Sequence, residues 1–301
     1  MRFTKVESIG NDFVLVEEAD IPGLPSDREH MLAKIAVLTS ERHFGVGSDG
    51  LLVVSKSGEN SVKLRMFNPD GTEDFCGNGI RCAAEYACAH GWVASQFTIQ
   101  HGGQDIPIEV NPIGMITSTL GRASYAPDDV PHTGIAELYN VSMFVDMIDG
   151  MPIHLFGSAL TTGSTHVVLP IASLPDEDTF LAVSPRLEVD PRFPARTSII
   201  WSQEVAENSL KLRIWERGVG ETFGCGTGSS AAVADYLRRK NRGGTVQVES
   251  KGGQLEIRMD AWNAPIKVSG RAQIVFEGDY FLDELTQNLP ASLNSAAVPA
   301  E

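Results

Sequence analysis

The 301-residue sequence contains no run of about 18 uncharged apolar residues, which is the shortest segment that crosses a membrane as a helix. Residues 1–12 alternate polar and apolar side chains and include no apolar stretch of the length found in signal peptides. We therefore expect a cytoplasmic protein with no membrane partner.

Basic residues are scarce as well. The chain has 24 lysines and arginines against 39 aspartates and glutamates, which gives a formal net charge of −15. A surface with this excess of negative charge repels phosphate backbones and anionic lipid headgroups. Nucleic acid is therefore excluded as an expected partner.

Cysteine is rare, with four residues at positions 76, 82, 88 and 225. Their spacing lacks the CxxC pairs of zinc sites and the density of a disulfide framework, so we expect no metal, and free thiols in a reducing compartment. Cys82 and Cys88 lie in an apolar segment, 80–90, where packing in a core explains them. Cys76 and Cys225 need a different explanation.

The sequence contains one long segment twice. The first copy begins with Lys63-Leu-Arg and leads to Cys76-Gly-Asn-Gly, and the second begins with Lys211-Leu-Arg and leads to Cys225-Gly-Thr-Gly. Each copy is followed by Gly-Gly-Gln, at 102–104 and at 252–254. The two cysteines are 149 residues apart, close to half of the chain, which indicates two homologous domains rather than a solenoid of short repeats.

Both halves show the same order of expected elements, with strands more numerous than helices. In the first half we expect strands at 12–17, 51–55 and 63–67, helices at 28–38 and 77–90, and a hairpin at 97–110. In the second half we expect strands at 166–169 and 212–215, a helix after Cys225, and a hairpin around 252–253. The predicted fold class is α/β of the α+β type, with two homologous lobes related by pseudo-twofold symmetry. Each lobe is a strongly curved, mostly antiparallel sheet wrapped round a central helix.

The repeat also divides the chain. We expect an N-terminal lobe at 1–125 and a C-terminal lobe at 126–273. The strand pattern near 274–285 is assigned to the N-terminal lobe, although by sequence alone it fits either. From 286 to 301 the composition turns to Asn, Pro, Ser and Ala without periodicity, so we expect a disordered tail.

Each repeated cysteine precedes Gly-x-Gly and an alanine-rich segment, which places its thiol at the N-terminus of a helix. Free backbone N–H groups and the helix dipole stabilise a thiolate there, so we expect a lowered thiol pKa. The same N–H groups bind a carboxylate. Gly77 and Gly226 lack a Cβ, which allows close approach to a ligand and a positive φ.

Two such cysteines on opposite sides of one cleft suit the inversion of a carbon centre. One thiolate removes the proton α to a bound carboxylate, while the opposite thiol donates a proton to the other face. Backbone N–H donors stabilise the charge that develops on the carboxylate. The pattern therefore predicts racemisation or epimerisation of an amino acid without a cofactor.

Other polar residues lie near the cysteine motifs. Glu216 and Arg217 follow the second repeated strand and supply a carboxylate for an ammonium group and a guanidinium for a carboxylate. Asn68 follows the first repeated strand, and Asn11 lies in a Gly-Asn-Asp turn. Each of these four also fits the simpler interpretation of a turn residue at the end of a strand.

Several motifs together resemble the diaminopimelate epimerase family of lysine and cell-wall biosynthesis, whose members work without pyridoxal phosphate. The resemblance covers about residues 1–285 and rests on these stretches: Phe3-Thr-Lys, Gly10-Asn-Asp-Phe13, Gly45-Val-Gly with Asp49, Phe67-Asn-Pro-Asp-Gly71, Cys76-Gly-Asn-Gly-Ile-Arg-Cys82, Glu216-Arg-Gly-Val-Gly-Glu-Thr222 and Cys225-Gly-Thr-Gly228. It implies a cofactor-independent isomerase in which Cys76 and Cys225 form the acid and base pair.

The resemblance also implies roles for the residues around the cysteines. The backbone N–H groups that hold the reacting carboxylate would belong to Gly77, Asn78, Gly226 and Thr227. The α-ammonium group would be bound by Glu216. The residues facing the distal end of the substrate would be Asn11, Asn68 and Arg217.

The chain departs from the family pattern at the distal end of the site. Where the family has Gly-Asn-Pro-His, this sequence has Gly163-Ser164-Thr165-His166, and Ser198 replaces a second asparagine. A serine hydroxyl is shorter than asparagine and lacks its amide, so direct contacts would become water-mediated or be lost. His166 fits a structural role as well as a catalytic one. We keep Ser164, His166 and Ser198 as candidate substrate-binding residues.

The sequence therefore predicts an isomerase that epimerises the α carbon of an amino acid, with LL-/meso-diaminopimelate as the leading substrate. Two alternatives stay open: a racemase or epimerase of another amino acid, because of Ser164 and Ser198, and a non-catalytic relative that binds an amino acid. The presence of both repeated cysteines argues against the second alternative. The oligomeric state is left open, with a homodimer as one option.

Overall fold

The computed structural model describes residues 1–21, 28–148 and 150–282. They form two compact units: residues 1–118 with the segment that begins at Arg271, and residues 119–270. The lobe boundaries expected from the sequence, after 125 and after 273, lie seven and three residues later. The tail expected at 286–301 lies outside the described residues. Among the described helices, none is long and apolar enough to cross a membrane.

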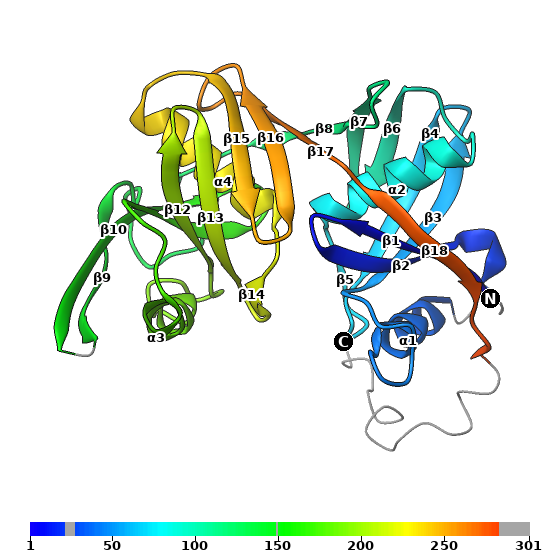
Figure 1. Ribbon diagram of the computed structural model, residues 1–301, viewed down its shortest axis with the longest axis horizontal. Coiled ribbons are helices and arrows are strands. Elements are labelled where there is room, and N and C mark those ends of the chain that lie inside the picture. Colours follow the sequence, from blue (N-terminus) through cyan, green and yellow to red (C-terminus); the bar gives the residue numbers. More distant parts are fainter. Residues whose placement is uncertain (22–27, 149, 283–301) are drawn as a thin grey trace. The chain divides into compact units, whose positions relative to one another are not determined.

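Unit 1 is built on one series of paired strands (Figure 1). In order of pairing they are β18 (Gln273–Asp279), β1 (Arg2–Ser8), β2 (Asn11–Glu17), β3 (Leu51–Gly58), β4 (Ser61–Phe67), β6 (Gln96–His101), β7 (Gln104–Val110) and β8 (Ile116–Arg122), with β5 (Glu73–Asp74) at the end of β4. The β2–β3 and β4–β6 pairs are parallel, and the others are antiparallel. The expected strands at 12–17, 51–55 and 63–67 are therefore confirmed.

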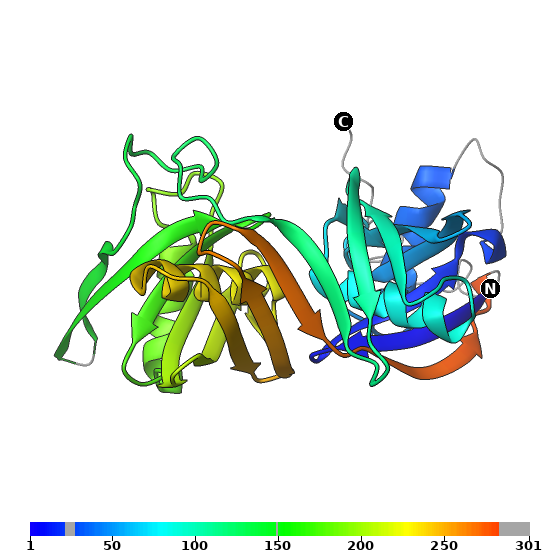
Figure 2. The same cartoon turned by 90° about the horizontal axis from the view of Figure 1, so that it is seen from above.

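Unit 2 repeats this pairing. Its strands are β9 (Val141–Ile148), β10 (Met151–Thr161), β11 (Thr165–Ile171), β12 (Ser198–Ala206), β13 (Ser209–Glu216), β15 (Gly244–Ser250), β16 (Gly253–Met259) and β17 (Pro265–Gly270), with β14 (Gly220–Thr222) at the end of β13. The parallel pairs are again the corresponding ones, β11–β12 and β13–β15. The β9–β10 hairpin projects from the rest of unit 2 in both Figure 1 and Figure 2.

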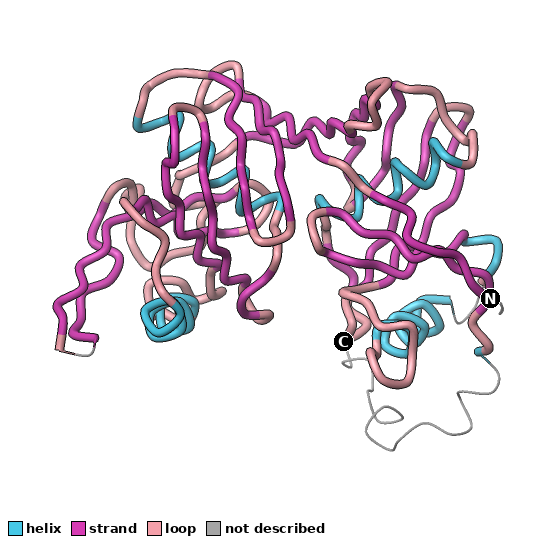
Figure 3. Tube along the Cα trace, viewed as in Figure 1, coloured by secondary structure: helices cyan, strands magenta, loops and turns pink. Residues whose placement is uncertain are grey.

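One helix packs against the inner side of the strands in each unit. In unit 1 this is α2 (Gly77–Ala89), which contacts β1, β2, β3, β4, β6 and β18, and ten of its thirteen residues are buried. In unit 2 it is α4 (Gly226–Arg239), which contacts seven strands from β10 to β17 and buries eleven of fourteen residues. Figure 3 shows the predominance of strands over helices in each unit. The predicted mixed fold with two lobes, each a sheet round a central helix, is confirmed.

Glycine allows these helices to approach the sheets closely. A Cβ added to Gly79 in α2 would lie 2.9 Å from Cδ2 of Leu52 in β3. A Cβ added to Gly228 in α4 would lie 2.6 Å from Cδ1 of Ile200 in β12. Both distances are shorter than a van der Waals contact, so a larger residue would require the Leu52 or Ile200 side chain to move. The second glycine of each Cys-Gly-x-Gly motif therefore fits without displacing these buried side chains.

A second helix covers the outer side of each sheet. In unit 1, α1 (Arg28–Ser40) buries Leu32 and Ile35 in a core with residues of β2 and β3. In unit 2, α3 (Glu177–Glu188) buries Phe180, Val183 and Leu187 against β11 and β12. The sequence predicted α1 but not α3, which contains a proline. A short 3-10 helix, η1 (Glu18–Asp20), follows β2.

The last described strand resolves a question that the sequence left open. β18 pairs antiparallel with β1, from Arg2 opposite Asp279 to Glu7 opposite Gln273. The amino group of Met1 donates to the carbonyl oxygen of Tyr280 at 2.9 Å, and the buried Tyr280 ring packs in the core of unit 1. The chain therefore returns to the N-terminal unit after passing through unit 2.

Candidate active site

Cys76 lies at the N-cap of α2. Its backbone is extended (φ −136°, ψ 111°), and its Sγ accepts a hydrogen bond from the backbone N–H of Gly79 at 3.4 Å. The first helical backbone bond runs from Ile80 N–H to the carbonyl oxygen of Cys76. The thiol therefore faces the N–H groups that begin the helix, as in a side-chain cap.

Cys225 occupies the same place in unit 2. It is the N-cap of α4 with extended backbone (φ −128°, ψ 117°), and its Sγ accepts from Gly228 N–H at 3.3 Å. The hydroxyl of Thr227 lies 3.3 Å from the same sulfur atom. Cys225 is buried, whereas Cys76 is half-buried. Each repeated motif thus places a sulfur atom at the start of a central helix.

The expected lowering of the thiol pKa is wrong for Cys225. Burial raises the pKa of this thiol above its ordinary value, and the negative charge of Glu216 raises it further. The hydrogen bonds from Thr227 and Gly228 act in the opposite direction but are weaker than the cost of removing a charge from water. Cys225 is therefore held as a thiol, the form that donates a proton.

The glycines that follow the cysteines are ordinary helical residues. Gly77 and Gly226 are the first residues of α2 and α4, and neither is among the described glycines with a positive φ. The positive φ that the sequence allowed is therefore not used at these positions. Their N–H groups remain available at the helix N-terminus for a carboxylate.

A buried arginine holds the first turn of α2, and the sequence did not single it out. Arg81 is fully buried, and its guanidinium donates to the Gly77 carbonyl at 3.2 Å, to Ser8 Oγ at 2.9 Å and to Oδ1 of Asn78. A charge in an otherwise apolar helical segment was the signal that could have identified it. These bonds fix the Asn78 amide so that its Nδ2 points to Oδ1 of Asn11, at 3.3 Å.

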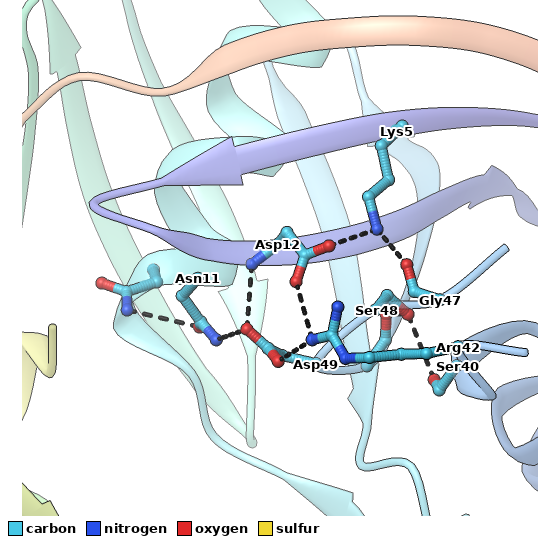
Figure 4. Close-up of polar contacts among 10 residues, drawn as sticks. Lys5, Asn11, Asp12, Ser40, Arg42, Gly47, Ser48 and Asp49 are labelled. Atoms are coloured by element: carbon cyan, nitrogen blue, oxygen red, sulfur yellow. Dashed lines mark hydrogen bonds and ion pairs between the residues drawn. The ribbon is translucent and has the colours of Figure 1, made fainter. Parts of the chain in front are cut away.

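Asn11 is oriented by a group of charged residues in unit 1 (Figure 4). Its Nδ2 donates to Oδ2 of Asp49 at 2.7 Å, and the same oxygen accepts from Asp12 N–H at 3.1 Å. Arg42 binds the other oxygen of Asp49 at 2.8 Å, and Lys5 forms an ion pair with Asp12. Because Nδ2 of Asn11 is engaged, its Oδ1 is left for Asn78 and lies 3.9 Å from the Cys76 sulfur.

His101 is a second residue that the sequence did not single out. Its Nε2 accepts from the backbone N–H of Cys76 at 3.1 Å, and its Nδ1 lies 3.1 Å from the carbonyl oxygen of Leu64. These partners assign a neutral ring with hydrogen on Nδ1. Burial lowers the pKa of His101, which favours this form, and the ring stacks on Phe75. His101 therefore fixes the backbone of Cys76.

Three candidate residues for substrate binding meet at one end of β13. The backbone N–H of Arg217 donates to Oγ of Ser198 at 3.1 Å, and the Arg217 guanidinium donates to the Ala195 carbonyl at 3.0 Å. Glu216 Oε1 accepts from the Thr222 hydroxyl at 2.5 Å. In unit 1, another candidate, Asn68, donates to Thr72 Oγ1 at 3.0 Å. Ser198, Glu216 and Arg217 thus form one group with Cys225, because Glu216 influences the Cys225 thiol.

Ser164 and His166 lie at the start of β11, where His166 is paired with Ser198 of β12. Oγ of Ser164 is 3.0 Å from Nε2 of His166 and 3.4 Å from Oγ1 of Thr227. His166 is buried, and its Nδ1 has no hydrogen-bond partner among the residues that the structure describes. Burial, together with the positive charge of Arg217, lowers the pKa of His166 to about 3. His166 is therefore neutral at physiological pH.

The buried His166 predicts that acid destabilises the protein. In the unfolded chain this histidine takes up a proton as the pH falls below its ordinary pKa of 6.5, whereas the folded side chain stays neutral down to about pH 3. Its contribution to stability is therefore complete above pH 6.5. It is lost as the pH falls toward 3, by at most about 1.4 kcal/mol per pH unit. Urea unfolding at pH 7.5, 6.5 and 5.5 measures the slope, and His166→Gln should reduce it. Identical slopes for the two proteins would contradict the assignment.

Comparison with known proteins adds an independent finding. Residues 3–126 and 158–275 match the family model described as diaminopimelate epimerase. Relatives of that name include one from Stutzerimonas stutzeri, 34% identical over 92% of this chain and 98% of its own, and one from Bacillus subtilis, 33% identical over 93% and 99%.

Solved structures of more distant proteins share the fold. A PhzF-family phenazine biosynthesis protein of Bacillus anthracis has a TM-score of 0.62 and 17% identity, over 94% of this chain and 99% of that one. A hydroxyproline epimerase from Agrobacterium vitis has a TM-score of 0.63 and 11% identity, over 92% and 90%. At such identities the likeness concerns the fold alone.

Proposed function

Because the chain belongs to the diaminopimelate epimerase family, we propose that it inverts the α carbon of diaminopimelate, between the LL and meso forms, with Cys76 and Cys225 as acid and base. The chain is an isomerase that acts on an amino acid. The choice of diaminopimelate follows the name of relatives that match more than nine-tenths of the chain. This reaction belongs to lysine biosynthesis.

The observation that carries the proposal is the repeated position of sulfur. In each unit a cysteine caps the central helix and accepts a hydrogen bond from the N–H of the third residue after it. A structural cysteine needs no such place in both halves of a duplicated chain. An acid and base pair that acts on the two opposite faces of one carbon does need an equivalent sulfur in each half.

The mechanism uses two proton transfers that balance. One cysteine thiolate takes the α proton and becomes a thiol, and the electron pair of the broken C–H bond stays on the α carbon and its carboxylate. The other thiol then donates its proton to the opposite face and becomes a thiolate. In the direction in which Cys225 is the donor, its raised pKa keeps that proton in place until the carbanion forms.

The remaining residues bind and orient the substrate in this proposal. The N–H groups of Gly77 and Asn78, and of Gly226 and Thr227, lie in the first turns of α2 and α4 and hold the reacting carboxylate. The carboxylate of Glu216 takes the α-ammonium group. The distal end of the substrate is bound by Asn11, Asn68, Ser164, His166, Ser198 and Arg217.

Substrate choice provides the test of this assignment. We expect LL-diaminopimelate to exchange its α hydrogen with deuterated solvent. We expect L-lysine, which lacks the distal carboxylate, to have a kcat/KM at least about 100-fold lower, because the Arg217 guanidinium would lose its partner. Exchange is followed by mass spectrometry across a panel of L-amino acids. Faster exchange of any other member would assign the protein to that substrate instead.

We propose the cytoplasm as the location of the reaction. All four cysteines are free thiols, and a mechanism that depends on two of them requires a reducing compartment.

A further inference from the structure

A continuous set of hydrogen-bonding side chains connects the sulfur of Cys225 to a buried histidine. Sγ of Cys225 lies 3.3 Å from Oγ1 of Thr227, which lies 3.4 Å from Oγ of Ser164, which lies 3.0 Å from Nε2 of His166. All four residues belong to unit 2. Each hydroxyl has two partners along this path, and a hydroxyl donates one hydrogen bond while it accepts others.

We propose that Thr227, Ser164 and His166 form a relay that stabilises the thiolate of Cys225, with Ser164 as the link that transmits the effect of the histidine. This inference rests on the proposed function for the catalytic role of Cys225 and goes beyond it by assigning positioning roles to the other three. His166 donates from Nε2 to Ser164, Ser164 donates to Thr227, and Thr227 donates to the sulfur.

The state of His166 sets the direction of these bonds. Its ring is buried and neutral, so one nitrogen carries hydrogen and the other does not. Nδ1 has no partner among the described residues, and a buried N–H without a partner is the rarer and costlier arrangement. The hydrogen therefore lies on Nε2, which makes His166 a donor to Ser164.

The chain of donors counteracts two effects that oppose ionisation of Cys225. Burial removes the sulfur from water, and the carboxylate of Glu216 adds a like charge beside it. Arg217 is the charged group that acts on His166, and its positive charge helps to keep the ring neutral. Each hydroxyl that donates toward the sulfur polarises the next, so the relay strengthens the last bond to the thiolate.

The corresponding residues of unit 1 do not form this relay. Leu52 and Ile200 are equivalent, because each lies against the second glycine of a Cys-Gly-x-Gly motif. Leu52 pairs with Leu15, and Ile200 pairs with Val168. Asn11 and Ser164, each four positions before these partners, are therefore equivalent. Asn11 contacts Asn78 in unit 1 as Ser164 contacts Thr227 in unit 2, but it contributes an amide oxygen that only accepts. The position equivalent to His166 is Phe13, whose side chain has no polar atom. The relay is thus specific to Cys225.

Ser164 is also one of the two positions at which this chain departs from the Gly-Asn-Pro-His pattern. An asparagine donates and accepts through different atoms, whereas one hydroxyl oxygen does both and is short enough to lie between His166 and Thr227. The serine is therefore suited to linking these two residues.

The relay can be tested by the reactivity of Cys225 without any substrate. Below its pKa, a thiol reacts with methyl methanethiosulfonate at a rate proportional to its thiolate fraction. We expect Thr227→Val, which removes the hydroxyl and keeps the shape, to slow modification of Cys225 about tenfold, or one pKa unit. Thr227→Ser should restore the rate to within about twofold of wild type. Modification of Cys76, followed in the same samples by peptide mass spectrometry, should stay unchanged.

A double-mutant cycle separates a relay from independent contacts. Ser164→Ala alone should slow modification of Cys225 about threefold, and it should add nothing in combination with Thr227→Val, because the link to the sulfur is then already broken. Multiplicative effects of the two substitutions, or a wild-type rate for Thr227→Val, would overturn the proposal. The modification assay uses no substrate. A failure to epimerise diaminopimelate would therefore contradict the proposed function without changing the outcome of this test of the relay.

Discussion

Replacement of Cys76 or Cys225 with serine is expected to lower kcat for epimerisation by about 1,000-fold or more. A serine hydroxyl fits the space and accepts the same bonds from Gly79 or Gly228, but at neutral pH it neither ionises as a thiol does nor takes up the α proton. General acid and base catalysis supplies on the order of 10² to 10⁴ in rate, and either substitution removes one of its two partners. The measurement is the interconversion of LL- and meso-diaminopimelate, resolved by chiral chromatography.

The matched control lies on the same helix as Cys76. Cys88 is a half-buried residue of α2, twelve positions after Cys76 and remote from the N-terminus of the helix. Cys88→Ser should keep kcat within about twofold of wild type and should have a thermal unfolding midpoint close to those of the Cys76 and Cys225 variants. If Cys76→Ser or Cys225→Ser retained a tenth of wild-type turnover, the two-base mechanism would be wrong.

Glu216→Gln is expected to change two observables in opposite directions. The loss of a carboxylate that binds the α-ammonium group should lower kcat/KM by about 100-fold, in the range found when one partner of a close charge pair is removed. The same substitution removes a negative charge that raises the pKa of Cys225, so the thiol should react faster with methyl methanethiosulfonate. Because unfolding would also lower activity and expose Cys225, the reactivity of the buried Cys82, which a folded variant leaves unchanged, is the control for a general loss of structure.

A control for charge alone is available in the same unit. Glu249 is an exposed residue of β15 that pairs with Lys211, and Glu249→Gln makes the same change of net charge. It should alter neither kcat/KM nor the reactivity of Cys225 by more than about twofold, because exposed ion pairs are weak and screened by salt. A Glu216→Gln variant that matched this control in both measurements would remove Glu216 from the site.

The two departures from the family pattern have different surroundings in the structure. The hydroxyl of Ser198 accepts from the Arg217 backbone, so it shapes the turn that presents the arginine. The hydroxyl of Ser164 contacts His166 and Thr227, and Thr227 in turn contacts the sulfur of Cys225. The serine at position 164, which the sequence analysis placed at the distal end of the substrate, is thus also connected to Cys225 through Thr227.

The residues that the sequence missed share one property. Arg81 and His101 act through other residues: Arg81 orients Asn78, and His101 binds the backbone of Cys76. Arg81 contacts a residue of its own helix, and its charge in a mostly apolar segment was its only local signal. His101 is 25 positions from Cys76, and a pairing at that separation depends on how the strands bring the chain together, so no local pattern could reveal it.

The sequence alone determined the duplicated organisation, because repeated motifs at half-chain spacing require equivalent elements in both halves. It also determined the two caps, because Cys-Gly-x-Gly before an alanine-rich segment leaves unpaired N–H groups for the sulfur to meet. The tertiary structure decided the protonation states. A helix N-terminus favours a thiolate, but burial and the charge of Glu216, which is nine positions from Cys225, outweigh it. The structure also decided that β18 belongs with β1, since strand pairing depends on contacts between ends of the chain that local composition does not encode.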